Sequence, residues 1–184
     1  RFATMRAKEY GQRKAELLPP TLDCFHRLAK DADLVLVEGA GSPAEINLRA
    51  GDIANMGFAE AAHLPVALIG DIDRGGVIAQ LVGTHTVLPP EDRARIKAFA
   101  INKFRGDPSL FADGAQAIAA HTDWSDLGVV PWFKDAWRLP AEDSLDITSR
   151  SGDGVHVVIP QIARIANFDD LDPLSVDPDF RVSF

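Results

Sequence analysis

The sequence predicts an α/β fold in which a parallel sheet is flanked by helices. Short apolar runs alternate with amphipathic stretches along most of the 184 residues, which is the order of elements in consecutive strand–helix–strand units. The apolar runs are continuous rather than alternating, as is typical of strands covered on both faces. Each run also ends in glycine or polar residues, where the loops of such a sheet begin.

The first half of the chain provides two helices and two strands. Apolar residues recur at helical spacing over Leu17–Ala29, and Cys24 on this helix is expected to pack in the core. Leu34–Val37 is a continuous apolar run that breaks at glycines, so a buried strand is expected there. A helix over Asp52–Ala62 begins with an aspartate that can cap it, and Val66–Ile72 is the second strand.

The second half continues the same order of elements. Apolar residues from Val77 to Val82 mark one face of a helix that follows a pair of glycines. Ile96–Ile101 is the third strand. A helix is expected from Pro108, a residue tolerated in a first helical turn, to about Ala120. Leu127–Phe133 is the fourth strand.

A shift in composition separates two predicted domains. Residues 139–154 are polar and rich in turn-forming residues, which is typical of a linker. The apolar run VHVVIPQI follows it and is expected to begin another buried strand. We therefore place a boundary near residue 150, with one domain over residues 1–150 and a second beginning in residues 151–184.

Composition excludes several classes of protein. The net charge of −8 argues against a general nucleic-acid binder, which would show a basic surface. No apolar run approaches the roughly 18 residues of a membrane span, and no signal peptide is recognisable, so no membrane partner is expected. The single cysteine cannot form an internal disulfide, which favours the reducing cytoplasm.

Polar side chains follow each predicted strand. Because the carboxyl ends of parallel strands meet at one edge of a sheet, these residues are expected to line one crevice. They are Glu38 after the first strand, Asp71 and Asp73 after the second, Asn102 and Lys103 after the third, and Pro131 after the fourth.

The chemistry of these residues leaves alternatives open. Glu38 could bind Mg²⁺, which prefers oxygen ligands and accompanies phosphates, or it could cap a neighbouring loop. Arg74 could clamp a carboxylate or phosphate with two hydrogen bonds, or it could pair with Asp71 to hold a tight turn. Asn102 and Lys103 could begin a loop that reads a nucleotide base, or could simply cap a loop. The sequence contains no GxxxxGK[ST] motif, so no phosphate-binding P-loop is expected in it. It also contains no HExxH and no paired CxxC, so no zinc site is expected.

The motifs together resemble the cobyric acid synthase family. VEGAG, SPAEINL, GDIDRGG and NKFRGD occur in the family's order, and the resemblance extends over about Tyr10–Leu174. VEGAG is shared with dethiobiotin synthetase, whereas the other three motifs are more specific. The resemblance implies a P-loop NTPase-like, dethiobiotin-synthetase-like domain, followed by the first strand of a class I glutaminase-like domain.

The resemblance also implies an activity. The family amidates side-chain carboxylates of adenosylcobyrinic acid a,c-diamide to give adenosylcobyric acid in cobalamin biosynthesis. ATP and Mg²⁺ convert the carboxylate to an acyl phosphate, and ammonia from glutamine displaces the phosphate. The partners implied are therefore the corrin substrate and glutamine or ammonia.

Roles for individual residues follow from matching motifs. Glu38 resembles the metal-binding glutamate of VEGAG, and Asp71 is the second residue assigned to catalysis. The residues assigned to the nucleotide are Asn102, Lys103 and Pro131. The residues assigned to the corrin are Ser42, Glu45, Asn47, Asp73 and Arg74.

Two expectations concern the ends of the chain and the competing functions. The family's P-loop is expected before Arg1 and its glutaminase cysteine and histidine after Phe184, so the chain is expected to be inactive alone. Cobyrinic acid a,c-diamide synthase and dethiobiotin synthetase are disfavoured by SPAEINL and by the C-terminal segment. The alternative from another class is a non-amidating switch or regulatory ATPase of the same fold, which would not need GDIDRGG.

Overall fold

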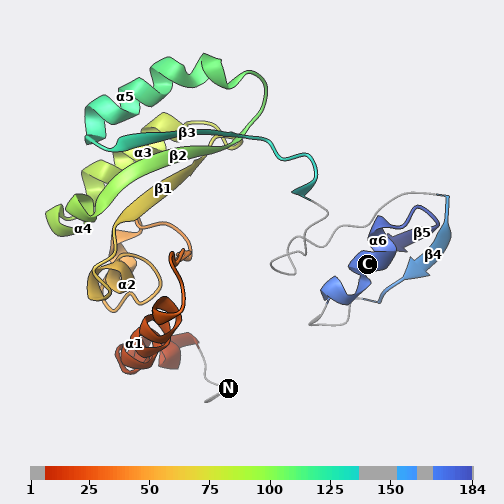
Figure 1. The fold of residues 1–184 in the computed structure, drawn as a ribbon, viewed down its shortest axis with the longest axis horizontal. Helices are drawn as coiled ribbons and strands as arrows, with labels where there is room; N and C mark the ends of the chain where they lie inside the picture. The colour runs from red at the N-terminus through yellow and green to blue at the C-terminus, as the bar shows by residue number, and fades with distance from the viewer. Residues whose placement is uncertain (1–6, 137–152, 161–167, 184) are drawn as a thin grey trace. The chain divides into compact units, whose positions relative to one another are not determined.

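The computed structural model of the chain describes residues 7–136, 153–160 and 168–183. It divides the chain into two compact units, residues 1–132 and 133–184, and each is described by itself (Figure 1). The predicted domain boundary near residue 150 lies outside the described residues, as does most of the predicted linker. Within the described ranges, no helix combines the length and apolar character needed to cross a membrane.

Each strand of the first unit follows one or more helices along the chain. The helices of this unit are α1 (Ala7–Lys30), η1 (Ile46–Leu48), α2 (Met56–Ala61), α3 (Val77–Val87), α4 (Pro90–Arg95), η2 (Pro108–Phe111) and α5 (Ala112–Thr122). Its strands are β1 (Val66–Asp71), β2 (Ile96–Phe104) and β3 (Ser125–Pro131). The second unit contains β4 (Val155–Val158), η5 (Phe168–Leu171), α6 (Asp172–Val176) and β5 (Phe180–Ser183).

The first unit is built on a parallel sheet with the strand order β1-β2-β3. Helix α3 lies between β1 and β2 along the chain, and α5 lies between β2 and β3. Because crossovers between parallel strands are nearly always right-handed, and both run in the same direction along the sheet, the two helices are expected on one face. The two helices pack against each other and against the sheet (Figure 1). The core lies between these layers, where Phe99, Ile101 and Ile118 are fully buried.

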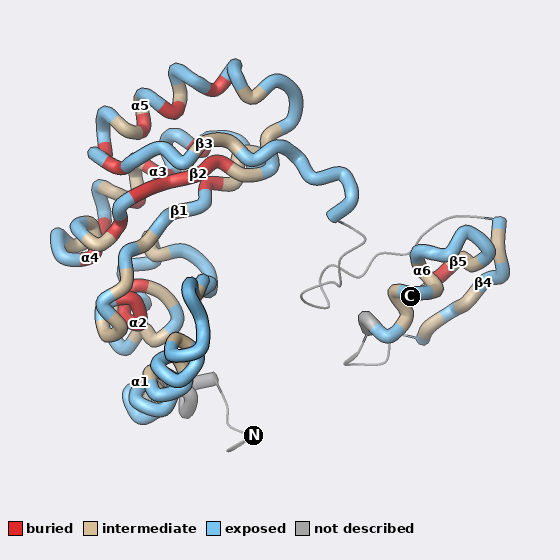
Figure 2. The backbone as a smooth tube through the Cα atoms, viewed as in Figure 1, coloured by how far each residue is buried: buried red, intermediate tan, exposed pale blue. Residues whose placement is uncertain are grey.

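The opposite face of this sheet is open at its edges. Leu68 faces the helices and is paired in register with Phe99, so the next residue, Ile69, points to the other face. Ile69 and Leu127, on the two edge strands, are each 62% exposed. Figure 2 shows buried residues gathered along β2, with β1 and β3 mostly exposed or intermediate. The expectation of strands covered on both faces therefore does not hold for the edge strands.

Three predicted strands and the helices between them are confirmed. The strands predicted over Val66–Ile72, Ile96–Ile101 and Leu127–Phe133 correspond to β1, β2 and β3, and β2 extends three residues further. The helix predicted from Pro108 is present as η2 followed by α5. The first helix is longer than Leu17–Ala29, because α1 already begins at Ala7.

The strand predicted over Leu34–Val37 is wrong. These residues form neither helix nor strand, and Leu34 and Leu36 are 76% and 86% exposed. A strand needs a neighbour to satisfy its backbone N–H and C=O groups, and no described strand pairs with this run. An apolar run indicates a tendency to be buried, but it cannot show whether a partner strand lies beside it.

Cys24 is also placed differently from the prediction. Its side chain is exposed on α1 and accepts a hydrogen bond from Arg27 Nη2 at 3.1 Å, so it does not pack in the core. Over residues 13–30, α1 has half-buried and exposed positions only. Its contact with the rest of the unit includes an edge-to-face packing of Phe25 on Phe58, with ring centroids 5.7 Å apart.

The second unit contains a two-stranded parallel pair, with Val155 opposite Phe180. The strand predicted at VHVVIPQI is present as β4, but it is not buried, because Val155 and Val158 are 65% and 63% exposed. Val182 of β5 is buried. The described part of this unit, which consists of β4, η5, α6 and β5, is small and leaves the apolar side chains of β4 largely uncovered.

Candidate functional site

Charged and amide side chains meet where β1 and β2 end. We call Asp71, Asp73, Asn102, Lys103 and Arg105 the carboxyl-end cluster. Asp71 lies opposite Asn102 in the parallel register, and the N–H of the residue after Asp71 donates to the Asn102 carbonyl at 3.2 Å. The sheet thus brings together residues that lie about thirty positions apart in the chain. This is the edge of an open parallel sheet at which ligands bind.

Two ion pairs join the strand ends across this cluster. Lys103 Nζ donates to Asp71 Oδ2 at 2.8 Å, and Arg105 Nε donates to Asp73 Oδ1 at 2.8 Å. The hydrogen bond from Lys103 lowers the pKa of the Asp71 carboxyl, and the bond from Arg105 does the same for the pKa of Asp73. Both carboxylates are therefore held in their charged form.

Arg74 is less tightly held than the other charged residues. Its Nε lies 3.9 Å from Asp71 Oδ2, and its side chain is 82% exposed. The turn after β1 is held by the Asp73 N–H, which donates to Asp71 Oδ1 at 3.0 Å. The sequence left open an Asp–Arg pair holding this turn. The structure has this pair as a long contact, and the shorter hydrogen bond from the Asp73 N–H to the Asp71 side chain holds the turn more closely.

Lys103 has an uncommon backbone conformation. Its φ is +64°, in the left-handed region that residues with a Cβ rarely adopt. The Asn102 side chain stabilises this turn, because Asn102 Oδ1 accepts a hydrogen bond from the Lys103 N–H at 2.8 Å. Residues in such conformations are concentrated at functional sites, which makes this strand end a candidate for ligand binding.

Arg105 and Trp132 extend the cluster toward β3. The Arg105 guanidinium lies over the Trp132 ring, 3.5 Å from its centroid. Pro131 pairs with Phe104, and the Trp132 N–H donates to the Phe104 carbonyl at 2.7 Å, so Pro131 and Trp132 end beside β2. The sequence reasoning did not assign a role to either Arg105 or Trp132. A signal for Arg105 was present, because the acidic pair and the basic pair are each spaced by two residues at neighbouring strand ends.

The other predicted site residues lie on a separate segment. Glu38, Ser42, Glu45 and Asn47 are all exposed. Among the residues that the structure describes, no hydrogen bond or ion pair joins them to the carboxyl-end cluster, and none involves the Glu38 carboxylate. The Ser42 side chain accepts a hydrogen bond from the Ala44 N–H at 3.2 Å. The described ranges contain no group of three His, Cys, Asp or Glu residues that could hold a metal ion.

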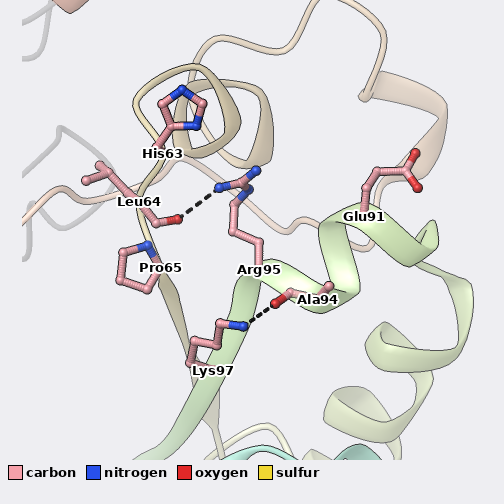
Figure 3. Close-up of a pocket in the computed structure, with 7 residues that line it drawn as sticks. All are labelled: His63, Leu64, Pro65, Glu91, Ala94, Arg95 and Lys97. Carbon is pink, nitrogen blue, oxygen red and sulfur yellow. Dashed lines mark hydrogen bonds between the residues drawn. The ribbon is translucent and has the colours of Figure 1, made fainter.

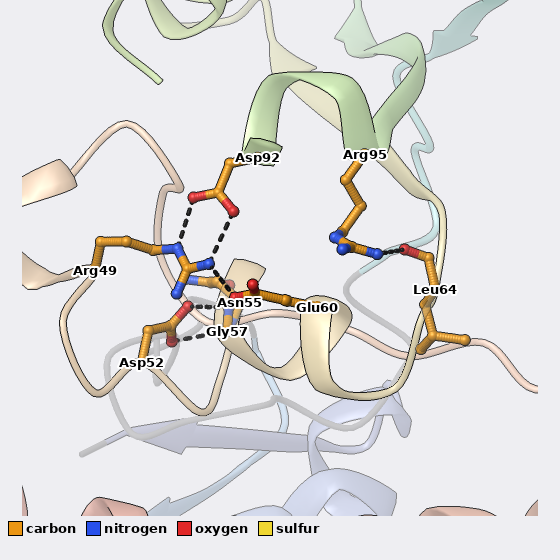
Figure 4. Close-up of polar contacts among 8 residues, drawn as sticks. All are labelled: Arg49, Asp52, Asn55, Gly57, Glu60, Leu64, Asp92 and Arg95. Atoms are coloured by element: carbon orange, nitrogen blue, oxygen red, sulfur yellow. Dashed lines mark hydrogen bonds and ion pairs between the residues drawn. The ribbon is translucent and has the colours of Figure 1, made fainter. Parts of the chain in front are cut away.

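Arg49, which follows that segment in the chain, is the centre of a partly buried group of ion pairs. Arg49 donates through Nε and Nη2 to both oxygens of Asp92, at 2.6 and 2.9 Å, and through Nη2 to Glu60 Oε2 at 2.7 Å (Figure 4). The Asp92 side chain is 1% exposed. The hydrogen bond to Asp92 raises the pKa of Arg49 above its usual value, against the effect of burial. This group connects the segment before α2 to α2 and α4.

The prediction that Asp52 caps this helix holds in part: its side chain accepts a hydrogen bond from an N–H in the first turn of α2, but the N-cap residue is Asn55 and α2 begins only at Met56. Asp52 Oδ2 accepts from the Gly57 N–H at 2.8 Å, and its Oδ1 accepts from the Asn55 N–H at 3.0 Å (Figure 4). The same Oδ1 also accepts from the Ala54 N–H at 2.8 Å. Burial alone would raise the pKa of the Asp52 carboxyl, but these hydrogen bonds outweigh it and the pKa is lowered. The Asn55 side chain in turn donates to the Ala40 carbonyl.

A pocket of about 330 Å³ lies at the opposite ends of the strands (Figure 3). It is found where β1 and β2 begin, and it contains none of the predicted site residues. Two of its basic groups are directed at backbone carbonyls: Arg95 Nη1 donates to Leu64 at 3.4 Å and Lys97 Nζ donates to Ala94 at 2.6 Å. Its lining residues are His63, Leu64, Pro65, Glu91, Ala94, Arg95 and Lys97.

The fold and the carboxyl-end cluster define a class: an α/β chain whose charged residues gather at the ligand-binding edge of a parallel sheet. Comparison with curated proteins makes this more specific. The chain is 66% identical over 178 residues to cobyric acid synthase of Ruegeria sp. (strain TM1040) and 60% identical over 184 residues to that of Jannaschia sp. (strain CCS1). It is 61% identical over 178 residues to cobyric acid synthase of Paracoccus denitrificans (strain Pd 1222).

These alignments cover 96 to 100% of this chain but only 37 to 38% of the length of the relatives. The resemblance inferred from the motifs is therefore confirmed: the chain corresponds to a segment of cobyric acid synthases. No protein-family model matches the chain. No solved structure matches it either.

Proposed function

We propose that this chain is the central part of a glutamine-dependent amidoligase of cobalamin biosynthesis. In this proposal the enzyme converts side-chain carboxylates of adenosylcobyrinic acid a,c-diamide to amides, through an acyl phosphate, and yields adenosylcobyric acid. The observation that carries the proposal is the 60 to 66% identity to cobyric acid synthases over nearly the whole chain. A cytoplasmic enzyme that takes glutamine or ammonia as nitrogen donor is part of the same proposal.

The carboxyl-end cluster is suited to a nucleotide and its metal ion. Mg²⁺ in phosphoryl-transfer sites uses one or two protein carboxylates and keeps water and phosphate oxygens as its other ligands, so a site without three protein ligands fits it. Asp71 could supply one such oxygen, as could Glu38 on its separate segment. Bound Mg-ATP would supply the phosphoryl group that activates the substrate carboxylate.

The basic residues of the carboxyl-end cluster would bind the negatively charged phosphates of the nucleotide. Lys103 and Arg105 are now paired with Asp71 and Asp73, and both can exchange part of these hydrogen bonds for phosphate oxygens. Their carboxylate partners hold them at the strand ends. Asn102 and Pro131 remain our candidates for contact with the adenine.

The segment over residues 42–47 is suited to a large, partly apolar ligand. Its polar side chains Ser42, Glu45 and Asn47 are exposed. Beside them Ile46 and Leu48 are 49% and 58% exposed, although they are apolar. A corrin combines an apolar ring system with polar side chains, so a surface of mixed character is complementary to it. We therefore assign the corrin to this segment, together with Asp73 and Arg74.

The test uses the complete gene product that contains this chain. It is incubated with Mg-ATP, glutamine and adenosylcobyrinic acid a,c-diamide, and the corrin is followed by mass spectrometry. We expect stepwise replacement of carboxyl groups by amides. ATP hydrolysis that leaves the corrin unchanged would instead support the regulatory ATPase of the same fold. The 184-residue chain assayed alone is expected to leave the corrin unchanged.

A further inference from the structure

We infer that Arg49 and Asp92 are positioning residues that hold residues 42–47, here called the substrate loop, in the conformation that receives the corrin. This inference rests on the proposed function, because it was there that the loop was assigned to the substrate. It gives a role to Arg49 and Asp92, which do not themselves touch the corrin in this proposal. Their contacts form a connection between the exposed loop and the body of the first unit.

Glycines in left-handed conformations lie on both sides of the substrate loop, Gly41 directly before it and Gly51 beyond Arg49. Gly41 and Gly51 both have φ of +73°, and an added Cβ would meet no atom within 4 Å at either position. Such glycines let the backbone turn sharply, but they also leave a segment many conformations to choose from. The loop therefore needs fixed points if its side chains are to face a ligand in one arrangement.

Arg49 provides the fixed point at the C-terminal end. It follows η1 directly and lies two residues after Asn47. Its planar guanidinium binds both oxygens of Asp92 through two parallel hydrogen bonds, a geometry that fixes orientation as well as distance. A third hydrogen bond, to Glu60, ties the same group to α2 (Figure 4). The N-terminal end is held by Asn55, which donates to the Ala40 carbonyl.

Burial makes the Asp92 carboxylate dependent on its ion pair with Arg49. Asp92 is 1% exposed, so its carboxylate has exchanged water for the guanidinium and depends on it. The exposed residues of the loop behave in the opposite way, because Glu45 and Asn47 form no side-chain hydrogen bond or ion pair with a described residue. One part of the segment is thus anchored in the protein, and the neighbouring part is left open to a ligand. Ordering the loop before binding lowers the entropy lost when the corrin binds.

The kinetic test uses conservative substitutions that change either the hydrogen-bond geometry or the charge of the Arg49–Asp92 pair. In the complete enzyme, Arg49→Lys keeps the charge but lacks the planar fork, and Asp92→Asn keeps the shape but lacks the charge. We expect each to raise the KM for the corrin about tenfold, with little change in the KM for ATP. Arg13→Met is the matched control, because it removes an exposed ion pair with Glu16 on α1. An unchanged corrin KM in a folded Arg49→Lys enzyme would overturn the inference.

A second measurement separates this inference from the proposed function and from a merely structural role. Amide hydrogen exchange of residues 42–48 is compared in the wild type, Arg49→Lys and Arg13→Met. We expect about tenfold faster exchange in Arg49→Lys, confined to this segment and α2. Equal rates would overturn the positioning role, whether or not the enzyme amidates a corrin. A wild-type enzyme that leaves the corrin unchanged would refute the proposed function, and the exchange rates would still decide whether the pair positions the loop.

Discussion

Charge pairing determines what each residue at the carboxyl-end cluster can do. Asp71 is held by Lys103 and Asp73 by Arg105, each at 2.8 Å. Arg74, by contrast, lies 3.9 Å from Asp71 and is mostly exposed. At the scale of single residues, the paired charges shape the site and Arg74 is the basic group most able to reach toward a ligand.

Arg74→Ala should therefore separate binding from stability. A long, exposed ion pair contributes on the order of 0.5 kcal/mol or less, so we expect the melting temperature to stay within about 2 °C of the wild type. The KM for the corrin should rise, because a donor to its carboxylates is lost. Steady-state kinetics and thermal unfolding of the complete enzyme measure both quantities. An effect confined to the KM for ATP would reassign Arg74 to the nucleotide.

Glu38→Ala is the corresponding test for the metal. The Glu38 side chain is exposed and forms no hydrogen bond or ion pair with a described residue, so the folded state should be unchanged. If this carboxylate binds Mg²⁺, amidation should fall by roughly a hundredfold and require more Mg²⁺. Turnover is measured over a range of Mg²⁺ concentrations at saturating ATP. Near-normal turnover would remove Glu38 from the catalytic residues.

At the scale of secondary-structure elements, α2 depends on the turn before it. This helix has only six residues, which is too short to be stable without contacts outside it. Asp52 supplies such contacts by accepting three backbone hydrogen bonds, including that from Gly57. The space is tight as well, because a Cβ on Gly57 would overlap the Asp52 carbonyl. The same helix carries Glu60, one of the anchors of the substrate loop.

Asp52→Ala should lower the free energy of unfolding by about 1 kcal/mol, the usual effect of losing a helix cap. Asp113→Ala is the control, because Asp113 lies in the first turn of α5 without a side-chain capping bond to that helix. Its effect should be smaller than half of that value. Urea unfolding of both variants provides the comparison. Equal destabilisation by the two substitutions would show that the Asp52 hydrogen bonds do not stabilise α2.

At the scale of the whole molecule, acidic groups dominate, and several carry lowered pKa values. Hydrogen bonds from Lys103 and Arg105 lower the pKa of Asp71 and Asp73, and backbone N–H donors lower the pKa of Asp52 and Asp107. A carboxyl whose folded-state pKa is lowered contributes stability above its unfolded pKa. That contribution is lost as the pH falls through the folded-state value.

The melting temperature should therefore fall slightly between pH 7 and pH 5, because burial lowers the pKa of His85 and the folded state resists its protonation. It should fall steeply below about pH 4, where the carboxylates with lowered pKa values are protonated. Thermal unfolding followed by circular dichroism at pH 7, 5, 4 and 3 measures the profile. Asp52→Asn should flatten the fall, because one of the carboxyl groups that must be protonated is absent. A melting temperature that rises on acidification would contradict the assigned directions of these pKa shifts.

Much of the first unit could be predicted from local pattern. The continuous apolar runs located β1, β2 and β3, and the capping aspartate before α2 was recognised by its position. The same reasoning failed at Leu34–Val37, because an apolar run looks alike with or without a neighbouring strand. It made no prediction for Asp92, which lies in the charged helix PEDRAR and is nevertheless buried in its pair with Arg49.

By itself, the sequence determined the parallel α/β character of the chain, its resemblance to cobyric acid synthases and the polar residues at the strand ends. Only the tertiary structure decided which of these residues meet. The register that sets Asp71 beside Asn102 also brings Lys103 and Arg105 to the two aspartates, while Glu38 and the substrate loop stay on another segment. The physical reason is that pairing and burial are relations between segments distant in the chain, whereas periodicity and capping act over a few neighbouring residues.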